Sequence, residues 1–122
     1  MRILICDDHE SIRGMIEALV SASGHQVVGV ASGSKAIECA ITERFDILLL
    51  DLMLPDIDGF EVCRRLREEE QTRNLPIFVI SAMDEPATRE RVKQVGATAF
   101  YAKPFNSMQL LEDIGNLEAD GR

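Results

Sequence analysis

Short apolar runs alternate along the chain with longer segments in which apolar residues recur every three or four positions. Runs of strand-forming residues occur at positions 3–6, 26–30, 47–50, 76–80 and 97–101. Most of the segments that follow these runs have the one-sided apolar spacing of an amphipathic helix. Because five strand and helix pairs follow one another without an internal repeat, the pattern predicts an α/β fold with a doubly wound parallel sheet.

Two of the runs also indicate their place in the sheet. The run from Ile47 to Leu50 is apolar at every position, as expected of a strand that helices cover on both faces. We therefore place it at the centre of the sheet. We place the run from Gln26 to Val30 at an edge.

The predicted helices differ in how much apolar surface they offer. The helix after the first strand has a continuous apolar face, made of Ile12, Met15, Ile16, Leu19 and Val20. Gly24 ends this helix, as a residue that tolerates positive φ should, and Gly59 is interpreted as a turn glycine that needs positive φ. The helix from Glu85 to Val95 is rich in charged residues and has few apolar ones. We expect it to be weakly anchored and therefore a candidate for movement.

Length and charge exclude several functional classes. The 122 residues fit one domain, in which residues 118–122 are interpreted as a frayed end or linker. Acidic residues outnumber basic ones by 21 to 13, and the net charge of −8 argues against direct binding of nucleic acid. The longest aliphatic run is far shorter than the roughly 20 residues of a membrane helix, and the start of the chain lacks a signal-peptide core. We expect a cytoplasmic protein without a membrane segment.

We assign no catalytic, redox or metal-binding role to the cysteine and histidine residues. Cys6, Cys39 and Cys63 lie in predicted strand or helical segments without CxxC-type spacing, so they are interpreted as small buried residues in a reducing compartment. His9 and His25 are interpreted as surface residues. His9 nevertheless lies beside a group of acidic residues and could contact a partner.

Polar residues stand where four of the predicted strands end. They are Asp7 and Asp8 after the first strand, Asp51 after the third, Ser81 after the fourth and Lys103 after the fifth. Because the carboxyl ends of parallel strands meet at one edge of a sheet, we expect these five side chains to lie close together. Two carboxylates about 4 Å apart repel each other by about 4 kcal/mol at an effective dielectric near 20. The pocket therefore calls for a cation.

The ligand types in this pocket favour Mg²⁺ over zinc, because they are oxygen atoms, and Mg²⁺ usually takes one or two carboxylates together with water and phosphate oxygens. An aspartate whose negative charge is balanced by a nearby cation can attack a phosphoryl group. The metal, Lys103 and a hydroxyl would then share the charge of the transferred group. As an alternative, each aspartate could be a helix N-cap and Lys103 a solvated lysine before a turn. Helix caps do not require a lysine at the end of the fifth strand, so the five residues together favour a phosphoryl and magnesium site.

Each of these residues belongs to a longer motif. The motifs are Asp-Asp after the first strand, D-L-M-L-P-D-I-D-G-F after the third, Ser-Ala after the fourth and K-P-F after the fifth. In this order they resemble the response-regulator receiver domain, and the resemblance covers essentially the whole chain. It implies a flavodoxin-like fold with strand order 2-1-3-4-5 and a role in two-component signalling.

The resemblance also implies roles for the pocket residues. Asp51 would be the phosphoacceptor, and Asp7 and Asp8 would be the acidic pair that holds Mg²⁺, with Asp8 as the direct ligand. Met53 would add its backbone carbonyl to the metal ligands. Lys103 would pair with an oxygen of the phosphoryl group.

Three further positions match residues that respond to the phosphoryl group in the family. Ser81 would hydrogen-bond a phosphoryl oxygen, and Tyr101 matches the switch aromatic that turns inward when Ser81 moves. Tyr101 could also be a half-buried strand aromatic without that role. Pro104 matches a proline that follows a cis peptide bond, here with Lys103.

Met53 and Met83 match two variable positions that tune the lifetime of the phosphoryl group in the family. Both are apolar in this chain. Because a thioether orients an attacking water poorly, we predict an acyl phosphate that outlasts those of members with polar residues at these positions.

The function that follows is a phosphorylation-dependent signalling switch. A histidine kinase or phosphotransfer protein would supply the phosphoryl group to Asp51, and the surface of the fourth helix, fifth strand and fifth helix would change to control a downstream effector domain or protein. The domain would not be an enzyme beyond assisting its own phosphorylation and slow autodephosphorylation. A magnesium-dependent phosphohydrolase with an Asp nucleophile and a phosphorylation-independent scaffolding receiver are the alternatives. The anionic loop after the first strand argues against a flavodoxin-like electron carrier.

Charges on the predicted fourth and fifth helices are compatible with a homodimer. Arg89, Arg91 and Lys93 on one helix are opposite in sign to Glu112 and Asp113 on the other. They could pair between two copies through this surface. Solvated faces are the commoner explanation of such charges.

Overall fold

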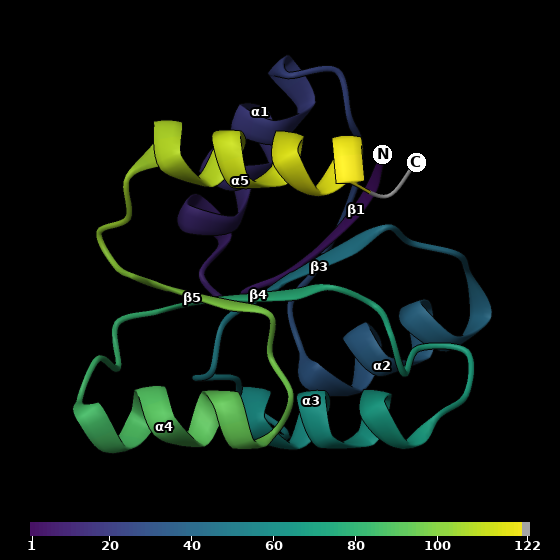
Figure 1. Ribbon diagram of the computed structural model, residues 1–122, viewed down its shortest axis with the longest axis vertical. Helices are drawn as coiled ribbons and strands as arrows, with labels where there is room; N and C mark the ends of the chain where they lie inside the picture. Colours follow the sequence, from purple (N-terminus) through teal and green to yellow (C-terminus); the bar gives the residue numbers. More distant parts are fainter. Residues whose placement is uncertain (121–122) are drawn as a thin grey trace.

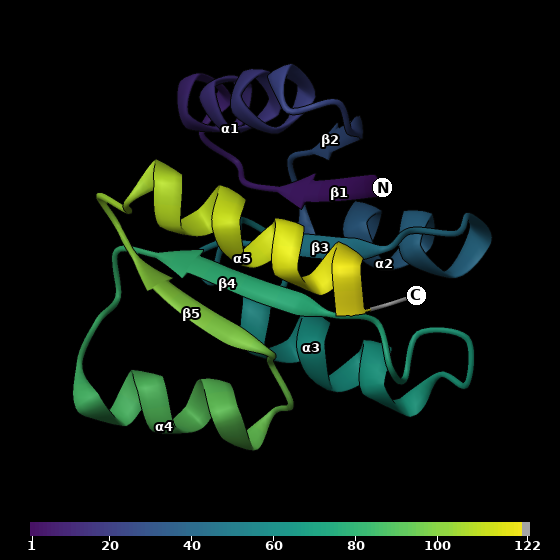
Figure 2. The ribbon, with the colours of Figure 1, turned by 45° about the horizontal axis from the view of Figure 1, so that its top comes forward.

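The computed structural model describes residues 1–120, which contain five strands and five helices in alternation. The strands are β1 (Arg2–Cys6), β2 (Gln26–Val30), β3 (Ile47–Leu50), β4 (Ile77–Ser81) and β5 (Ala99–Ala102). The helices are α1 (Glu10–Ala22), α2 (Gly33–Thr42), α3 (Gly59–Glu68), α4 (Pro86–Gln94) and α5 (Ser107–Asp120). All strands pair in parallel in the order β2-β1-β3-β4-β5, as Figure 2 shows. The predicted fold and strand order are confirmed. Within residues 1–120 no helix has the length and apolar character that spanning a membrane requires.

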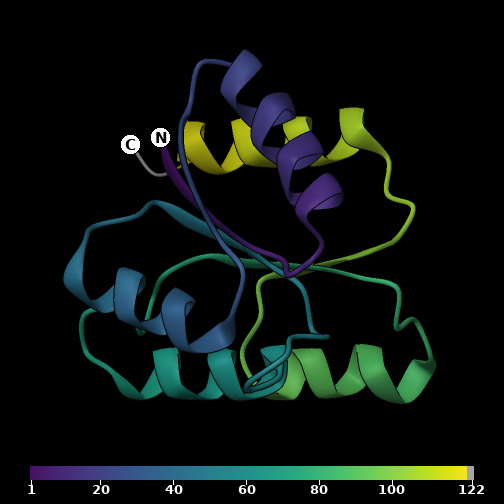
Figure 3. The same cartoon turned by 180° about the vertical axis from the view of Figure 1, so that it is seen from behind.

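Helices cover both faces of the sheet (Figures 1 and 3). α1 and α5 lie on one face, and α2, α3 and α4 lie on the other. The side chains of the central strands divide between two cores accordingly: Leu48 and Leu50 join the core under α2 to α4, whereas Ile47 and Leu49 join the core under α1 and α5. Because successive strand residues point to opposite faces, a run that is apolar at every position fills both cores. Each fully buried Leu or Ile contributes about 1.5–3 kcal/mol relative to an exposed one.

Side chains and a glycine define the helix ends. The hydroxyl of Ser32 accepts the N–H of Lys35 at the start of α2, and Asn106 Oδ1 accepts the N–H of Gln109 at the start of α5. Gly24 follows α1 with a φ of 93°. A residue with a Cβ rarely adopts this left-handed conformation, so the prediction that Gly24 ends the helix is confirmed.

The predicted apolar face of α1 is wrong at one position. Met15 is 54% exposed, whereas Ile16 is buried and Ile12 and Leu19 pack at the margin of the core. Successive residues lie about 100° apart around a helix. Met15 is therefore turned away from the sheet when Ile16 points directly into it.

The end of the chain is more ordered than predicted. α5 continues to Asp120, so residues 118–120 are helical rather than a frayed end or linker. Leu117 packs against the core, and the amino terminus of Met1 lies 3.6 Å from the Glu118 carboxylate. These contacts anchor the last turn of α5 beside β1. Residues 121–122 of the predicted tail lie outside the described residues.

The three cysteines are free thiols, and all of them are buried, as predicted. Burial raises the pKa of Cys63 to about 12. Burial, and then the nearby Asp7 carboxylate, raises the pKa of Cys6 to about 12. Such thiols are poor nucleophiles and serve as small apolar residues of the core.

Candidate functional site

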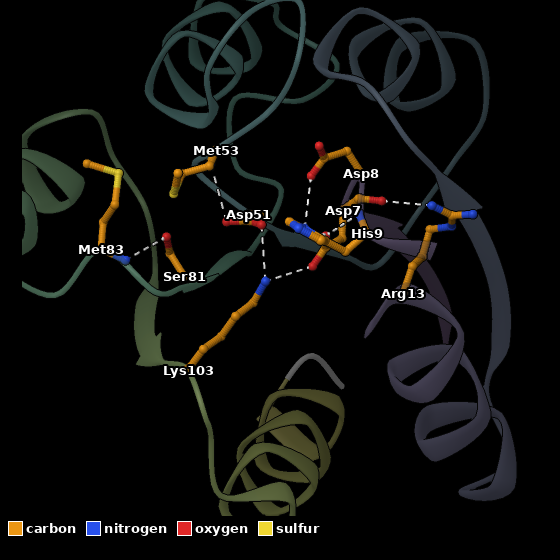
Figure 4. A network of polar contacts seen from close by, with 9 residues as sticks. All are labelled: Asp7, Asp8, His9, Arg13, Asp51, Met53, Ser81, Met83 and Lys103. Atoms are coloured by element: carbon orange, nitrogen blue, oxygen red, sulfur yellow. Dashed lines mark hydrogen bonds and ion pairs between the residues drawn. The ribbon is translucent and has the colours of Figure 1, made fainter. Parts of the chain in front are cut away.

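The carboxyl ends of four strands carry the five predicted site residues. These are Asp7 and Asp8 after β1, Asp51 after β3, Ser81 at the end of β4 and Lys103 after β5. Because β1, β3, β4 and β5 are consecutive neighbours in the sheet, their ends converge. Figure 4 shows the five side chains around one common space.

Lys103 connects two of the carboxylates. Its Nζ donates to Asp7 Oδ2 at 2.9 Å and to Asp51 Oδ2 at 3.1 Å, and all three side chains are largely buried. Burial by itself lowers the pKa of Lys103, but the hydrogen bonds and charges of Asp7 and Asp51 outweigh it and raise the pKa above its ordinary value. Lys103 is therefore protonated at neutral pH and neutralises part of the acidic cluster.

The two adjacent aspartates differ in how much of each carboxylate is accessible. Asp7 is buried, and its Oδ1 accepts the backbone N–H of His9 at 2.9 Å while its Oδ2 accepts Lys103. Asp8 is exposed at the rim of the site. Asp8 thus offers the more accessible carboxylate to a metal ion, whereas Asp7 orients the lysine and the loop.

Asp51 is held at the base of the site. It is only 4% exposed, and its backbone N–H continues the pairing of β3 with β1 by donating to Cys6 O. Oδ2 accepts Lys103, and Oδ1 accepts a longer bond of 3.3 Å from the N–H of Met53. Oδ1 therefore keeps the capacity to bind a cation or to attack a phosphorus atom.

Ser81 and Lys103 are joined through the backbone of their neighbouring strands. The N–H of Lys103 donates to Ser81 O at 2.9 Å, and the Ser81 hydroxyl accepts the N–H of Met83 at 3.2 Å. Ser81 is fully buried, and Figure 4 shows it across Asp51 from the adjacent acidic pair. The peptide bond between Lys103 and Pro104 is cis, as the resemblance implied.

Tyr101 lies outside this cluster and faces α5. Its ring packs 5.6 Å from the ring of Phe78, and its hydroxyl donates to Asp113 Oδ2. Burial and then the hydrogen bond to Asp113 raise the pKa of Tyr101 well above its ordinary value. No pattern in the sequence identifies Asp113 as the partner of Tyr101, because the pair depends on how α5 packs across β5.

Gly59 is required for a reason other than the predicted one. Within residues 1–120, positive φ occurs only at Gly24 and Gly96, so Gly59 does not need it. A Cβ at position 59 would instead lie 2.6 Å from the Asp51 carbonyl oxygen and 2.8 Å from Leu52 Cα. The glycine lets the start of α3 approach the backbone of the site.

The aspartates of the site do not cap the helices beside them. α1 begins after His9 without a side-chain cap bond, and α3 is capped by Asp58, whose Oδ1 accepts the N–H of Glu61. Asp7 and Asp51 instead accept the N–H two residues further along the chain, before either helix begins. Their carboxylates are thus directed at the site rather than at a helix terminus.

His9 belongs to the same cluster, although it is not among the five residues predicted from the strand ends. Carboxylate oxygens of Asp7, Asp8 and Asp51 and a ring nitrogen of His9 all lie within 4.8 Å of one another. This spacing and these ligand types fit a divalent cation, because hard divalent cations prefer carboxylate oxygens as ligands. The signal in the sequence was the position of His9 directly after the acidic pair.

A groove of about 510 Å³ opens beside the site. Its lining includes Asp8, His9, Met53, Met83 and Arg91 of α4. The groove gives a partner access from solvent to the acidic cluster. It also joins the cluster to α4.

The model of the family described as "Response regulator receiver domain" matches residues 3–115. The chain belongs to this family. Receiver domains are regulatory domains of two-component signalling, and the fold, the strand order and the acidic cluster of this one agree with that assignment.

Individual relatives agree with the family assignment. PleD, a response regulator of Caulobacter vibrioides, is 35% identical over 116 residues, a match that covers 95% of this chain and 26% of PleD. The chain thus spans about a quarter of the length of that relative. A response regulator structure from Chloroflexus aurantiacus superimposes with a TM-score of 0.91 and 31% identity over 97% of both chains. The receiver domain of the Pseudomonas aeruginosa sensor histidine kinase PA1611 has a TM-score of 0.88 and 32% identity over 95% of both chains, and it holds a magnesium ion in its active-site cleft.

Proposed function

We propose that this receiver domain accepts a phosphoryl group on Asp51 from a histidine kinase or a phosphotransfer protein and thereby controls a downstream effector domain or protein. The observation that carries the proposal is the setting of Asp51, a buried carboxylate that shares Lys103 with Asp7 at 3.1 Å and 2.9 Å. Lys103 is placed to neutralise charge on a group attached to Asp51. The groove beside Asp8 gives a phosphodonor access.

The transfer is a displacement at phosphorus. An oxygen of Asp51 attacks, a P–O bond forms, and the P–N bond of a phosphohistidine donor breaks as the imidazole leaves and takes up a proton. Mg²⁺ held by Asp8, Asp51 and the carbonyl of Met53, with Asp7 beside it, would neutralise charge on the transferred oxygens. Lys103 stays protonated through the reaction because its pKa is raised. It can exchange its contact with Asp51 for one with a phosphoryl oxygen.

The response to phosphorylation would start at Ser81. Its hydroxyl now accepts the N–H of Met83, and the hydroxyl hydrogen can be donated to a phosphoryl oxygen on Asp51. Movement of Ser81 toward the phosphoryl group would vacate space for Tyr101, whose hydroxyl would then leave Asp113. A shift of this equilibrium from 1:99 to 99:1 requires about 5.5 kcal/mol, which several charge-assisted hydrogen bonds can supply.

The surface that reports this change would be made of α4, β5 and α5. α4 buries only Thr88 and Val92, and two arginines stack on neighbouring rings: Arg91 lies 4.0 Å from the Phe60 ring and Arg89 lies 4.6 Å from the Phe100 ring. A helix held by so few contacts can be displaced at low cost. The effector would read its position.

A homodimer through the same surface is part of the proposal. Arg89 already pairs with Asp84, and Asp113 accepts Tyr101 and Gln109. The pairing predicted between copies therefore has to compete with contacts inside one copy. Lys93 and Glu112 remain exposed for contacts between copies.

Incubation with acetyl phosphate and Mg²⁺, followed by intact mass measurement, tests the proposal. We expect one phosphoryl adduct that depends on Mg²⁺ and is absent from the Asp51→Asn variant. Steady turnover of phosphate esters without an adduct would support a phosphohydrolase instead. No adduct and no turnover in any sample would support a scaffolding receiver that does not use phosphorylation.

A further inference from the structure

The imidazole of His9 lies at the open side of the acidic cluster. Its Nδ1 is 3.3 Å from Asp8 Oδ1 and 3.6 Å from Asp7 Oδ1, and the side chain is 65% exposed. Figure 4 shows the ring beside the carboxylates of Asp7 and Asp8. The ring therefore lies close to both carboxylates although most of its side chain is exposed to solvent.

The backbone holds His9 in this place. The N–H of His9 donates to Asp7 Oδ1 at 2.9 Å, and His9 is the N-cap residue of α1. Arg13, one turn into α1, donates through Nη1 to the carbonyl oxygen of Asp7 at 2.9 Å. The loop is thus fixed on both sides of Asp8.

The distances fit neighbouring ligands of a single ion. Six-coordinate ions of the size of Mg²⁺ have bonds of about 2.1 Å, so adjacent ligand atoms lie about 3 Å apart. The separation of 3.3 Å between His9 Nδ1 and Asp8 Oδ1 is close to this value, and an Asp51 oxygen lies within 4.8 Å of the other ligand atoms.

Imidazole nitrogen distinguishes among divalent ions. Mg²⁺ binds oxygen ligands and water, whereas later first-row ions such as Co²⁺ and Ni²⁺ gain affinity from an imidazole ligand. We propose that His9 is a metal ligand of this site and that it makes the site prefer later first-row divalent ions over Mg²⁺. The inference rests on the proposed function, because it concerns the metal that serves Asp51.

Calorimetric titration with MgCl₂ and with CoCl₂ tests the proposal in the unphosphorylated protein. The samples are wild type, His9→Ala and His25→Ala in a non-coordinating buffer at one slightly alkaline pH. His25 is the matched control, because it is the other imidazole of the chain and lies beside Met1 at the opposite edge of the sheet. We expect His9→Ala to weaken Co²⁺ binding about tenfold or more, as loss of a ligand does, and Mg²⁺ binding less than twofold. His25→Ala should change neither affinity.

Proton NMR of the Co²⁺ complex supplies a second measurement. A coordinated imidazole gives a strongly shifted exchangeable ring signal, which should be present in wild type and His25→Ala and absent in His9→Ala. Equal loss of Mg²⁺ and Co²⁺ affinity in His9→Ala, or no loss of either, would overturn the proposal. Because metal binding is measured without a phosphodonor, its failure is separate from failure of Asp51 to become phosphorylated.

Discussion

Replacement of Lys103 by methionine tests the electrostatics of the site most directly. Lys103 Nζ contacts Asp7 and Asp51, whose side chains are 3% and 5% exposed. Methionine is unbranched like lysine but carries no charge. The variant therefore leaves two buried carboxylates without their shared cation.

The expected loss of stability follows from this burial. Removal of one partner from a buried ion pair costs about 3–5 kcal/mol. Because the lysine side chain is 14% exposed and water reaches the site through its rim, we expect a value near the lower end of this range. Asp51→Asn in the same background removes one of the two unpaired charges. The coupling energy between Lys103 and Asp51 should then be about 1.5–3 kcal/mol, as for a hydrogen bond between charged groups.

Urea unfolding of the two single variants, the double variant and wild type measures these quantities by circular dichroism in Mg²⁺-free buffer of low ionic strength. Addition of Mg²⁺ should restore part of the stability lost in Lys103→Met, since an ion that binds only the folded state stabilises it. A coupling energy below about 0.5 kcal/mol, the usual scatter of additive pairs, would refute the reasoning. So would a Lys103→Met variant as stable as wild type.

The difference in stability between wild type and Lys103→Met should depend on pH. The pKa of Lys103 is raised in the folded state, so its contribution to stability is fully present below the ordinary lysine pKa of about 10.4. The contribution is lost as the pH rises above that value and through the folded-state pKa. The stability difference between wild type and Lys103→Met should therefore be constant near neutral pH and shrink in strongly alkaline solution.

Three further predictions concern residues around the site. Asp113→Asn should lower the pKa of Tyr101 toward the ordinary value of about 10, and ultraviolet titration can follow it cleanly because the chain has one tyrosine and no tryptophan; an unchanged titration curve would contradict the assignment. Met53→Asn should shorten the lifetime of the acyl phosphate, measured by the decay of the adduct mass, and slower decay in the variant than in wild type would overturn this prediction. Gly59→Ala should destabilise the fold by about 1–3 kcal/mol, because its Cβ would lie 2.6 Å from a backbone oxygen. Gly115→Ala, with open space around the position, should be neutral or stabilising in the same unfolding assay.

The residues of the pocket could be predicted because their positions depend on local pattern. Asp7, Asp51 and Lys103 each stand directly after an apolar run, and the end of such a run marks the end of a strand. A parallel sheet then joins these ends at one edge, whatever the details of packing. The contacts of Lys103 with both carboxylates follow from that topology.

Features that depend on the approach of two elements could not be predicted in the same way. The bond from Tyr101 to Asp113 requires the position of α5 over β5, and the need for Gly59 arises from the distance between α3 and the backbone of Asp51. Met15 was misassigned because an apolar stripe at helical spacing has edges, and the angle at which α1 meets the sheet decides which edge is exposed. Neither distance nor angle is encoded in spacing alone.

The anchoring of α4 combines both kinds of information. Its small apolar face was correctly predicted to bury little, but Arg89 and Arg91 were interpreted as solvated or as partners of a second copy. The structure places them on the rings of Phe100 and Phe60, at 4.6 Å and 4.0 Å. Exposed cation and ring pairs contribute about 0.5–1 kcal/mol each. α4 is thus held by these two weak contacts together with a small apolar face, in which Thr88 and Val92 are buried.

This weak anchoring matters because α4 follows the site almost directly in the chain. Ser81 ends β4, its hydroxyl accepts the N–H of Met83, and α4 begins at Pro86. On the proposed mechanism, a phosphoryl group on Asp51 draws the Ser81 hydroxyl away from Met83 and frees the loop that leads into the helix. The two arginine contacts together contribute about 1–2 kcal/mol, whereas charge-assisted hydrogen bonds to the phosphoryl group contribute about 1.5–3 kcal/mol each. Two or three such bonds exceed the contribution of the two arginine contacts, so a phosphoryl group on Asp51 can supply free energy of the size that these contacts hold.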